Sequence, residues 1–365
     1  MIMSHKKKKI ALIGYRLSGG GSDKVMANLS VFFERQGFEV DIIIVLNEVS
    51  FPYSGKLVNL GLLKNENNDF FNKTKRLWAL RKYLNENKFD FIIDFRFRTK
   101  IIQELILARL IYNTKTIFTV HSFLIDHYMP NNSWLTRLMY NHCYANVAIV
   151  EEMKTLIEKK HRLKNVITIH NPVYLAEILE KQKENIKIGF DYIVAVGQYE
   201  NEIKQFDKLI SSYAKSVLPQ KQIHLIIVGD GNGKKLRKTA FENDTEEFVH
   251  LVGYQTNPFQ FIVKSKFLVL CSQNEGFPNV ILEALACKIP VVSFDCDFGP
   301  RDIIVNLENG ILVENQNWEK LTGAMNLLVL DDVLYKHCKE NTFKSVQPFL
   351  LEKIGQEWLH LLKAN

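Results

Sequence analysis

Two glutamates, Glu275 and Glu283, lie on either side of a Gly-Phe-Pro turn in the stretch NEGFPNVILEALACKIPVVSFDCDFGPRD, residues 274–302. A helical pattern begins at Asn279 and places Glu283 about one turn in. Backbone N–H groups at a helix start have no partner within the helix and favour an anion such as a diphosphate. A carboxylate one turn in can accept hydrogen bonds from both hydroxyls of a ribose, and Glu275 can accept one from a sugar hydroxyl. Each acid alone is better explained as a solvated residue, but together they predict a site for a phosphorylated, sugar-like ligand.

Glycines end several of the expected strands. Gly19–Gly21 separate the first strand from a helical pattern that starts at Ser22, and in the second half Gly197 and Gly229 each close a strand. Glycine lets backbone N–H groups approach a ligand closely, and the helix start favours an anion. The first loop matches neither GxGxxG nor GxxxxGK followed by Ser or Thr. Alone, it indicates a tight turn for packing as readily as a phosphate site.

Short apolar runs alternate with helical patterns along the whole chain. Most runs are continuously apolar, which is typical of parallel strands that are covered on both faces. The pattern predicts an α/β fold with two doubly wound, Rossmann-like domains. The expected strands are 9–15, 38–46, 89–95, 115–121, 146–150, 165–170, 191–197, 224–230, 248–254, 267–272, 290–295 and 310–313, and helices are expected at 22–36, 75–87, 201–217 and 279–286.

The domain boundary is expected in the charged stretch 175–191, which has little strand character. We therefore expect an N-terminal domain over 1–180 and a C-terminal domain over 181–349, of which the second contains Glu275 and Glu283. The final helix, 350–365, is expected to pack on either domain, including by crossing back to the first.

The composition, with 47% hydrophobic and 24% charged residues, is that of a soluble globular protein, and no apolar segment is long enough to span a membrane. Five scattered cysteines without a CxxC pair indicate reduced thiols and a cytoplasmic protein. The net charge of +7 is uneven: residues 1–180 hold 26 Lys and Arg against 17 Asp and Glu, and the remainder holds 21 against 23. The basic half is therefore the part expected to meet an anionic partner.

The stretch EGFPNVILEALACKIPVVSFD resembles the signature of the family 4 glycosyltransferases, retaining enzymes of the GT-B fold, in which two such domains face a central cleft. Its E-x7-E pattern corresponds to Glu275 and Glu283. Further features match in order: GGSDK at 20–24 is similar to the family's glycine loop, His121 ends a strand, Asn171-Pro172-Val173 lies at the domain crossover, and GPRDII at 299–304 resembles the loop that follows the signature. GYQTNPF at 253–259 is typical of bacterial members that build surface polysaccharides.

The resemblance implies that the N-terminal domain binds the acceptor and the C-terminal domain binds the nucleotide sugar. It also implies roles for individual residues. Glu283 would bind the donor ribose, Glu275 the donor sugar, and His121 would lie near the transferred sugar, aligning it or stabilising charge. Lys204 would neutralise the leaving diphosphate, with Arg301 as a helper. The remaining donor-binding residues implied are Gly20, Gly21, Gly197, Gln198, Gly229, Gly276, Phe277, Pro278, Asn279 and Val280.

One position departs from the family pattern. The family usually has VGRL followed by a lysine, and this Arg/Lys pair neutralises the diphosphate. Here the sequence is VGQYENEIKQF, so Gln198 replaces the arginine and Lys204 comes one residue late. Glutamine donates hydrogen bonds but carries no charge, so Lys204 is expected to supply most of the positive charge.

The resemblance therefore implies that the protein is a hexosyltransferase, which moves a hexose or N-acetylhexosamine from a nucleotide-diphosphate sugar, by resemblance a UDP-sugar. The acceptor implied is a growing surface glycan or a polyprenyl-diphosphate-linked acceptor. The anomeric bond would loosen toward an oxocarbenium-like state and the acceptor would attack from the same face. Two alternatives remain open: a nucleotide-sugar epimerase of the same fold and a catalytically inactive partner subunit, which the loss of charge at Gln198 would favour. An NAD-dependent enzyme is disfavoured because GxGxxG is missing.

No metal or other cofactor is expected. Asp295-Cys296-Asp297 spells DxD, but it follows a buried strand and is interpreted as a strand end. Residues 70–88 mix aromatic side chains with five basic ones, Lys73, Lys75, Arg76, Arg81 and Lys82. This pattern is typical of a helix on an anionic membrane, here the cytoplasmic face of the inner membrane, and equally of a surface helix whose apolar stripe is core. No nucleic-acid motif is present.

Overall fold

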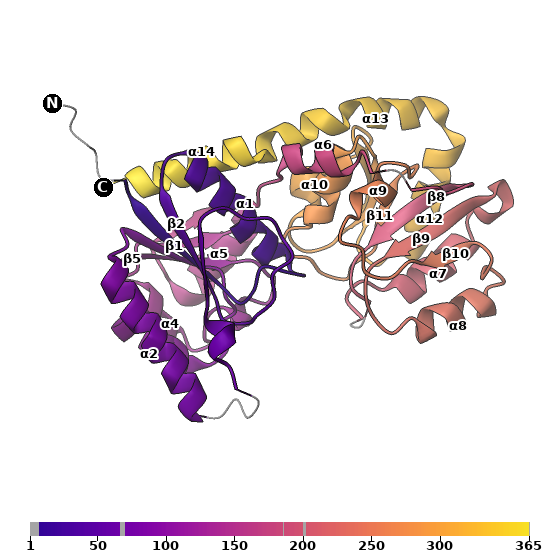
Figure 1. Ribbon diagram of the computed structural model, residues 1–365. Coiled ribbons are helices and arrows are strands. Elements are labelled where there is room, and N and C mark those ends of the chain that lie inside the picture. Colours follow the sequence, from indigo (N-terminus) through magenta and orange to yellow (C-terminus); the bar gives the residue numbers. More distant parts are fainter. Residues whose placement is uncertain (1–6, 66–69, 185, 200–201, 365) are drawn as a thin grey trace. The chain divides into compact units, whose positions relative to one another are not determined.

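The structure is a computed structural model that describes residues 7–65, 70–184, 186–199 and 202–364. The chain forms two compact units (Figure 1): the first comprises Met1–Pro172 with Leu351–Asn365, and the second comprises Val173–Leu350. The first unit thus ends before the stretch 175–191 in which the boundary was predicted. The reason is that α6, Leu175–Lys181, packs on α9, Phe259–Ile262, and α10, Asn279–Ala286, of the second unit.

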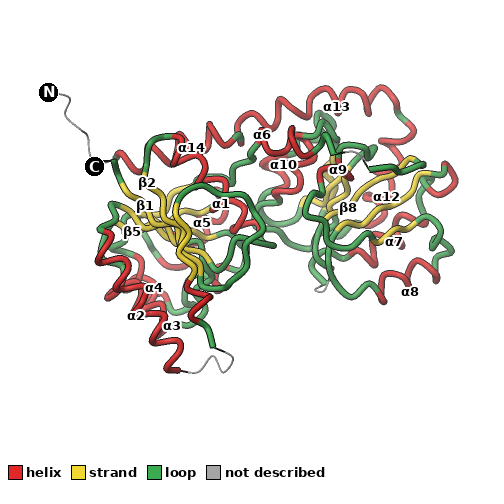
Figure 2. The backbone as a smooth tube through the Cα atoms, viewed as in Figure 1, coloured by secondary structure: helices red, strands yellow, loops and turns green. Residues whose placement is uncertain are grey.

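The first unit is built on a parallel sheet of seven strands in the order β3-β2-β1-β4-β5-β6-β7. Helices flank this sheet, as the predicted doubly wound fold requires (Figure 2). The strands are β1 Lys9–Gly14, β2 Glu39–Ile44, β3 Lys56–Asn59, β4 Phe91–Asp94, β5 Lys115–Val120, β6 Ala145–Ala148 and β7 Val166–Thr168. The helices are α1 Gly21–Arg35, α2 Phe70–Asn87, α3 Ile101–Ile106, α4 Ser133–Tyr140, α5 Glu151–His161 and α14 Leu351–Lys363, with short turns η1 Leu60–Leu63, η2 Leu107–Ile111 and η3 Ile125–His127.

The last helix of the chain, α14, packs against α1 within this first unit (Figure 1). The contact depends on a glycine, because a Cβ on Gly355 would lie 2.4 Å from the Phe32 ring. One turn along, Trp358 is 2% exposed and meets Phe33 edge to face at 6.5 Å. An apolar face of α14 therefore covers α1 and completes the core of the unit.

The second unit has a parallel sheet of six strands in the order β10-β9-β8-β11-β12-β13. Its strands are β8 Asp191–Val196, β9 Ile223–Val228, β10 Val249–Leu251, β11 Leu268–Leu270, β12 Val291–Asp295 and β13 Gly310–Glu314. Besides α6, α9 and α10, its helices are α7 Phe206–Ala214, α8 Lys234–Glu242, α11 Pro300–Ile303, α12 Trp318–Leu330 and α13 Asp332–Val346, with turns η4 Pro219–Lys221 and η5 Gln347–Phe349.

All twelve predicted strands are confirmed, and the two doubly wound sheets confirm the predicted fold class. The short strand β3 was not predicted, since its four residues KLVN are partly exposed and carry little apolar signal. The helix predicted over 201–217 begins at a residue, Asn201, that lies outside the described ones. From residue 202 on the predicted start is wrong: α7 begins only at Phe206, because Gln205 has a left-handed backbone with φ 49°. In the part of the chain that the structure describes, no helix is both long and apolar enough to cross a membrane.

Candidate functional site

The candidate residues of the second unit gather at one edge of its sheet. Because all six strands are parallel, the loops that follow them emerge at the same edge. Strand order reverses between β8 and β11, since the chain continues from β8 to β9 on one side and returns to β11 on the other. Ligands of open α/β sheets bind outside such a switch point. The loops after β8 and β11 carry Lys204 and Glu275, so the switch point is where these two meet.

Helix α10 starts at this switch point, directly after Pro278. Glu283 lies one turn inside the helix, at a half-buried position next to four buried apolar neighbours on the same helix. Phe277 is 6% exposed and its ring packs on Phe349, so its side chain belongs to the core and only its backbone can serve a ligand. The loop before α10 is held in place by Gly299, where a Cβ would lie 2.6 Å from Pro278 Cδ.

Lys204 and Glu275 form an ion pair with 2.6 Å between Nζ and Oε1. Their side chains are 22% and 14% exposed, so the pair is partly shielded from water. The two residues come from loops that are 71 positions apart in the chain. Sequence reasoning placed both in the site but did not predict that they would bind each other. A cation and a carboxylate are thus fixed side by side, next to the start of α10.

Glycines at the ends of β8 and β9 allow two loops to touch. A Cβ on Gly229 would lie 1.8 Å from the carbonyl oxygen of Gly197, so no larger residue fits there. The Lys204 side chain crosses Gly197, where a Cβ would meet Lys204 Cε at 2.9 Å. The glycines therefore make room for the lysine that reaches Glu275.

The other predicted sources of positive charge are arranged differently. Gln198 is exposed in the loop after β8. Arg301 forms a two-pronged ion pair with Asp295, at 2.9 Å for both hydrogen bonds. The carboxylate of Asp295 offsets the charge of Arg301, which weakens the predicted helper role. The same pairing accounts for the first acid of the DxD sequence, and within the described ranges no three His, Cys, Asp or Glu side chains are placed to hold a metal ion.

In the first unit, the glycine loop lies between β1 and α1, at the switch point between β1 and β4. Gly20 precedes the helix and Gly21 is its exposed first residue. Asp23 is 7% exposed in the first turn, and its burial raises its pKa to about 7, although Arg16 at 3.5 Å opposes this shift. Arg16 also binds Glu48 at 2.7 Å. An acid was not predicted at this loop, and it places a titratable group beside the expected phosphate position.

His121 lies directly after β5, and both nitrogens of its ring are buried without a hydrogen-bond partner within hydrogen-bonding geometry. The ring stacks on Phe95 with 5.6 Å between centroids. Burial, together with the charge of Arg98, lowers the pKa of His121 to about 3, against an opposing effect of the Asn171 amide. The imidazole is therefore neutral near pH 7, with one donor and one acceptor nitrogen. Of the two roles implied for it, alignment by hydrogen bonding fits this state and stabilisation by a positive charge does not.

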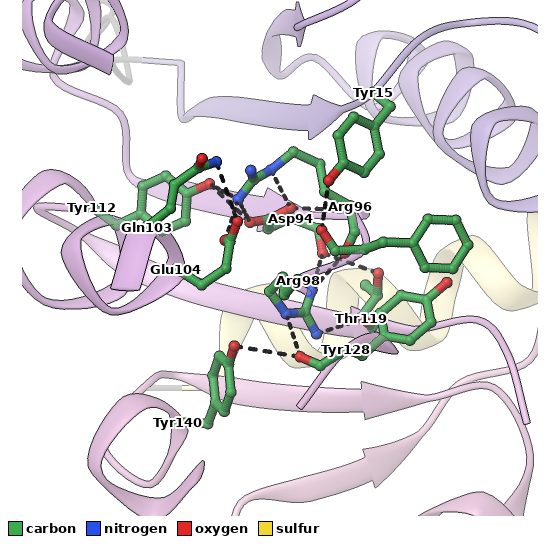
Figure 3. Close-up of polar contacts among 11 residues, drawn as sticks. Tyr15, Asp94, Arg96, Arg98, Gln103, Glu104, Tyr112, Thr119, Tyr128 and Tyr140 are labelled. Atoms are coloured by element: carbon green, nitrogen blue, oxygen red, sulfur yellow. Dashed lines mark hydrogen bonds and ion pairs between the residues drawn. The ribbon is translucent and has the colours of Figure 1, made fainter. Parts of the chain in front are cut away.

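Buried charges support the loop after β4 (Figure 3). Arg96 Nη2 lies 2.7 Å from Asp94 Oδ2 and 3.0 Å from Glu104 Oε2, and all three side chains are at most 4% exposed. The Tyr112 hydroxyl donates to Asp94 at 2.8 Å. Burial alone would raise the pKa of Asp94, but the charges of Arg96 and Arg98 hold it below its usual value.

Sequence reasoning missed this network and its arginines. The available signal was the run FRFR directly after the buried strand FIID, because arginines at the end of a buried strand need partners in the interior. The structure therefore brings the predicted residues together in two groups. Gly20, Gly21 and His121 lie at the carboxyl edge of the first sheet, and the other twelve lie at the carboxyl edge of the second: Gly197, Gln198, Lys204, Gly229, Glu275, Gly276, Phe277, Pro278, Asn279, Val280, Glu283 and Arg301.

Comparison with known families gives matches to two family models that together cover most of the chain. Residues 19–177 match the model described as "Glycosyltransferase Family 4", and residues 177–345 match "Glycosyl transferases group 1". The two models meet at Glu177, close to where the two compact units divide.

Several known proteins are similar over nearly their whole length. An N-acetylgalactosamine-N,N'-diacetylbacillosaminyl-diphospho-undecaprenol 4-alpha-N-acetylgalactosaminyltransferase of Campylobacter jejuni is 26% identical, over 97% of this chain and 99% of its own. A lipopolysaccharide 1,6-galactosyltransferase of Salmonella typhimurium is also 26% identical, over 90% and 92%. A crystal structure of S. aureus TarM, solved as a mutant with UDP among its ligands, superposes with a TM-score of 0.78 at 17% identity, over 98% of this chain and 100% of that one.

Proposed function

Because this chain belongs to the glycosyltransferases of family 4 and group 1, enzymes of the GT-B fold, we propose that it moves a hexose or N-acetylhexosamine from a UDP-sugar to a lipid-linked surface glycan. The observation that carries the proposal is the Lys204–Glu275 ion pair beside the start of α10. This arrangement offers a cation, a carboxylate and a helix start to one small ligand. The donor assignment is supported by the UDP in the TarM structure, and the acceptor by the diphospho-undecaprenol named for the Campylobacter relative.

In the proposed reaction, the leaving UDP gains negative charge as the anomeric bond lengthens. Lys204 supplies a cation and the first peptides of α10 supply N–H dipoles, which together stabilise that charge. Glu283 accepts hydrogen bonds from the ribose hydroxyls and so fixes the nucleotide. Glu275 both orients Lys204 and accepts from a hydroxyl of the donor sugar. The work of these residues is positioning and electrostatic stabilisation.

The neutral His121 would bind a hydroxyl of the transferred sugar. Its two buried nitrogens otherwise carry the cost of lost hydrogen bonds, and a ligand hydroxyl would satisfy one as donor or acceptor. The acceptor hydroxyl would then attack from the face that the diphosphate leaves, with retention of the anomeric configuration, and the departing phosphate oxygen would take its proton. Atoms and charge balance without a cofactor or metal ion.

The lipid-linked acceptor suggests contact with a membrane surface. In α2 the buried side is apolar, with Leu80 at 4% and Leu84 at 0% exposure. The opposite side exposes Phe71 at 80% and Trp78 at 67%. Exposed cations accompany these rings on the same side: Lys75, Arg81 and Lys82. Aromatic rings among cations suit an anionic lipid surface on the cytoplasmic side.

A nucleotide panel tests the proposal directly. The melting midpoint is measured with UDP, GDP, UDP-GlcNAc, UDP-GalNAc, UDP-Glc, UDP-Gal and GDP-Man, for the wild type and for Glu283→Ala. A ligand at ~100 times its dissociation constant adds about 2.7 kcal/mol to the stability of the folded state. We expect a rise with UDP and with one UDP-sugar that is lost in Glu283→Ala. Glu242→Ala, an exposed position on α8, is the matched control and should keep the rise.

Three other results would contradict parts of the proposal. A rise with GDP and GDP-Man alone would exclude a UDP-sugar donor. An equal rise in wild type and Glu283→Ala would exclude the ribose contact. Conversion of a UDP-sugar to its epimer without any acceptor, detected by chromatography of the nucleotide sugars, would replace transfer by epimerisation.

A further inference from the structure

Arg98 is a buried arginine whose side chain, among the described residues, donates hydrogen bonds to backbone carbonyls and to no carboxylate. It is 1% exposed. Its Nε donates to the carbonyl of Tyr128 at 3.0 Å, Nη2 to that of Thr119 at 2.9 Å and Nη1 to that of Arg96 at 3.1 Å (Figure 3). Arg96, two residues earlier, has two acids as partners instead. A buried cation that donates only to carbonyls requires an explanation, because an apolar side chain could fill the same volume without the desolvation cost.

The carbonyls that Arg98 binds define one particular segment. Thr119 lies near the end of β5, and Tyr128 follows the turn η3. The backbone N–H of Arg98 adds a bond to the carbonyl of His127 at 2.6 Å. The guanidinium thus clamps both ends of residues 119–128 to the chain that leaves β4. His121 lies inside this clamped segment.

Tyr128, whose carbonyl Arg98 binds, also contacts His121 itself. The phenol oxygen of Tyr128 interacts with the backbone N–H of His121. Tyr128 is 1% exposed, and its ring lies 5.3 Å below the Arg98 guanidinium. The carbonyl of Tyr128 is therefore held by Arg98, while its phenol oxygen faces the backbone N–H of His121.

The His121 ring is fixed from the same direction. It stacks on Phe95, which lies between β4 and the two arginines. Neither ring nitrogen has a hydrogen bond within strict geometry, but the Asn171 amide still acts on the ring as a hydrogen-bonding group. The direction in which the imidazole points therefore depends on its backbone, on this stacking and on Asn171. The backbone of His121 lies in the clamped residues 119–128, and Phe95 lies in the chain after β4 to which Arg98 holds them.

We propose that Arg98 is a positioning residue that holds residues 119–128 so that His121 presents its ring nitrogens at a fixed point to the transferred sugar. This role rests on the proposed function, in which His121 binds the donor sugar. The arginine itself touches no substrate. Its planar fork reaches three carbonyls at once, which lysine cannot do.

The test is a double-mutant cycle with Arg98→Lys and His121→Ala, read as UDP release from UDP-GlcNAc, UDP-GalNAc, UDP-Glc and UDP-Gal. If Arg98 acts through His121, Arg98→Lys lowers kcat about 100-fold, the cost of a small misplacement, with little change in the KM of the donor. The double variant then loses no more than His121→Ala alone. Losses that multiply in the double variant would overturn the proposal, since independent sites are additive.

Arg96→Lys is the matched control, because Arg96 is equally buried but bonds to Asp94 and Glu104. It should lose stability without a coupling to His121. Tyr128→Phe is a second test that leaves Arg98 unchanged. It removes only the hydroxyl that faces the His121 N–H. It should also lower kcat and add nothing to His121→Ala. Additive loss in this arm would count against the proposal even if Arg98→Lys failed to fold.

The position of the imidazole is also read without activity. Nitrogen-15 NMR of the His121 ring reports its tautomer and environment, and these should change in Arg98→Lys but stay as in the wild type in Arg96→Lys. An unchanged His121 signal in Arg98→Lys would overturn the positioning role. A wild type that releases UDP from none of the four donors, with the expected ring shifts present, would instead contradict the proposed function and leave the positioning role supported.

Discussion

Lys204 Nζ lies 2.6 Å from Glu275 Oε1, and this pair joins the loops that follow β8 and β11. A second pair joins the opposite ends of the same two strands: Lys266 Nζ lies 2.9 Å from Asp191 Oδ2, at the starts of β11 and β8. The first pair lies at the switch point, where a ligand is expected to bind, and the second lies at the amino edge, where none is expected. Variants of the two pairs can therefore be compared to distinguish a role of Lys204 in the reaction from a role in linking the two strands.

Lys204→Met should lower kcat for UDP release by about 10²–10³, the cost of removing one preorganised donor to a developing negative charge. Lys266→Met removes the pair at the amino edge and should leave kcat unchanged. Steady-state kinetics of both variants, together with their melting midpoints, check this. Equal losses of kcat in the two variants would mean that Lys204 only links the strands.

Gln198→Arg should strengthen UDP binding, because it adds a cation to a loop where the family pattern has one. One charge-assisted hydrogen bond contributes roughly 1.5–3 kcal/mol, which corresponds to about 10-fold or more in the dissociation constant. Isothermal titration with UDP measures the gain, and uridine, which lacks the diphosphate, should show none.

Gln220→Arg is the control for added surface charge, since Gln220 is exposed in the turn η4 before β9. It should leave UDP binding as in the wild type. An unchanged UDP affinity in Gln198→Arg would mean that Lys204 already supplies the charge that the diphosphate needs.

The fold was readable from the sequence because parallel strands buried on both faces leave continuous apolar runs, as in β1 and β9. The boundary between the units was not, because α6 is a charged helix whose assignment depends on what it packs against. The start of the helix predicted over 201–217 was wrong for a local reason: a left-handed residue, Gln205, precedes α7. Such backbone choices follow from tertiary contacts and leave no periodic signal.

The site was predictable only in part. Glu275 and Glu283 form a local pattern, and both lie where a ligand site is expected. The partner of Lys204 was not predictable, because 71 residues separate it from Glu275 and only the sheet brings them together. The role of Arg98 was hidden for the same reason, since its partners are carbonyls, and backbone carbonyls occur at every position of a sequence.

Lys75→Glu combined with Trp78→Ser should weaken binding to vesicles that contain phosphatidylglycerol. Each cation near an anionic surface contributes about 1 kcal/mol, so reversing one charge and removing one exposed ring should lower the partition coefficient by more than 10-fold. Flotation with phosphatidylglycerol vesicles and with pure phosphatidylcholine vesicles measures it. Lys238→Glu, exposed on α8, is the matched control. Equal flotation of all three proteins would exclude α2 as the membrane contact.

Asp23→Asn should change how the stability of the chain depends on pH. The pKa of Asp23 is raised by burial from 3.8 to about 7 in the folded state. Between these two values the folded state retains a proton that the unfolded state has lost, so stability falls as pH rises, by at most about 1.4 kcal/mol per pH unit. The asparagine side chain does not ionise, so the stability of the variant should not show this decline. The difference in stability between the variant and the wild type should therefore shift in favour of the variant from pH 4.5 to pH 8.

Urea unfolding at pH 4.5, 6 and 8 measures the free energy for both proteins. Asp126→Asn gives a contrast of opposite sign, because the hydrogen bond from Lys160 at 2.6 Å lowers the pKa of Asp126. That carboxylate stabilises the fold above its unfolded pKa and loses its effect only as pH falls below it, so its variant should keep the decline between pH 4.5 and 8. If Asp23→Asn kept the wild-type decline as well, the buried acid would be ionised throughout, and the glycine loop would carry a fixed negative charge where the resemblance implies a phosphate.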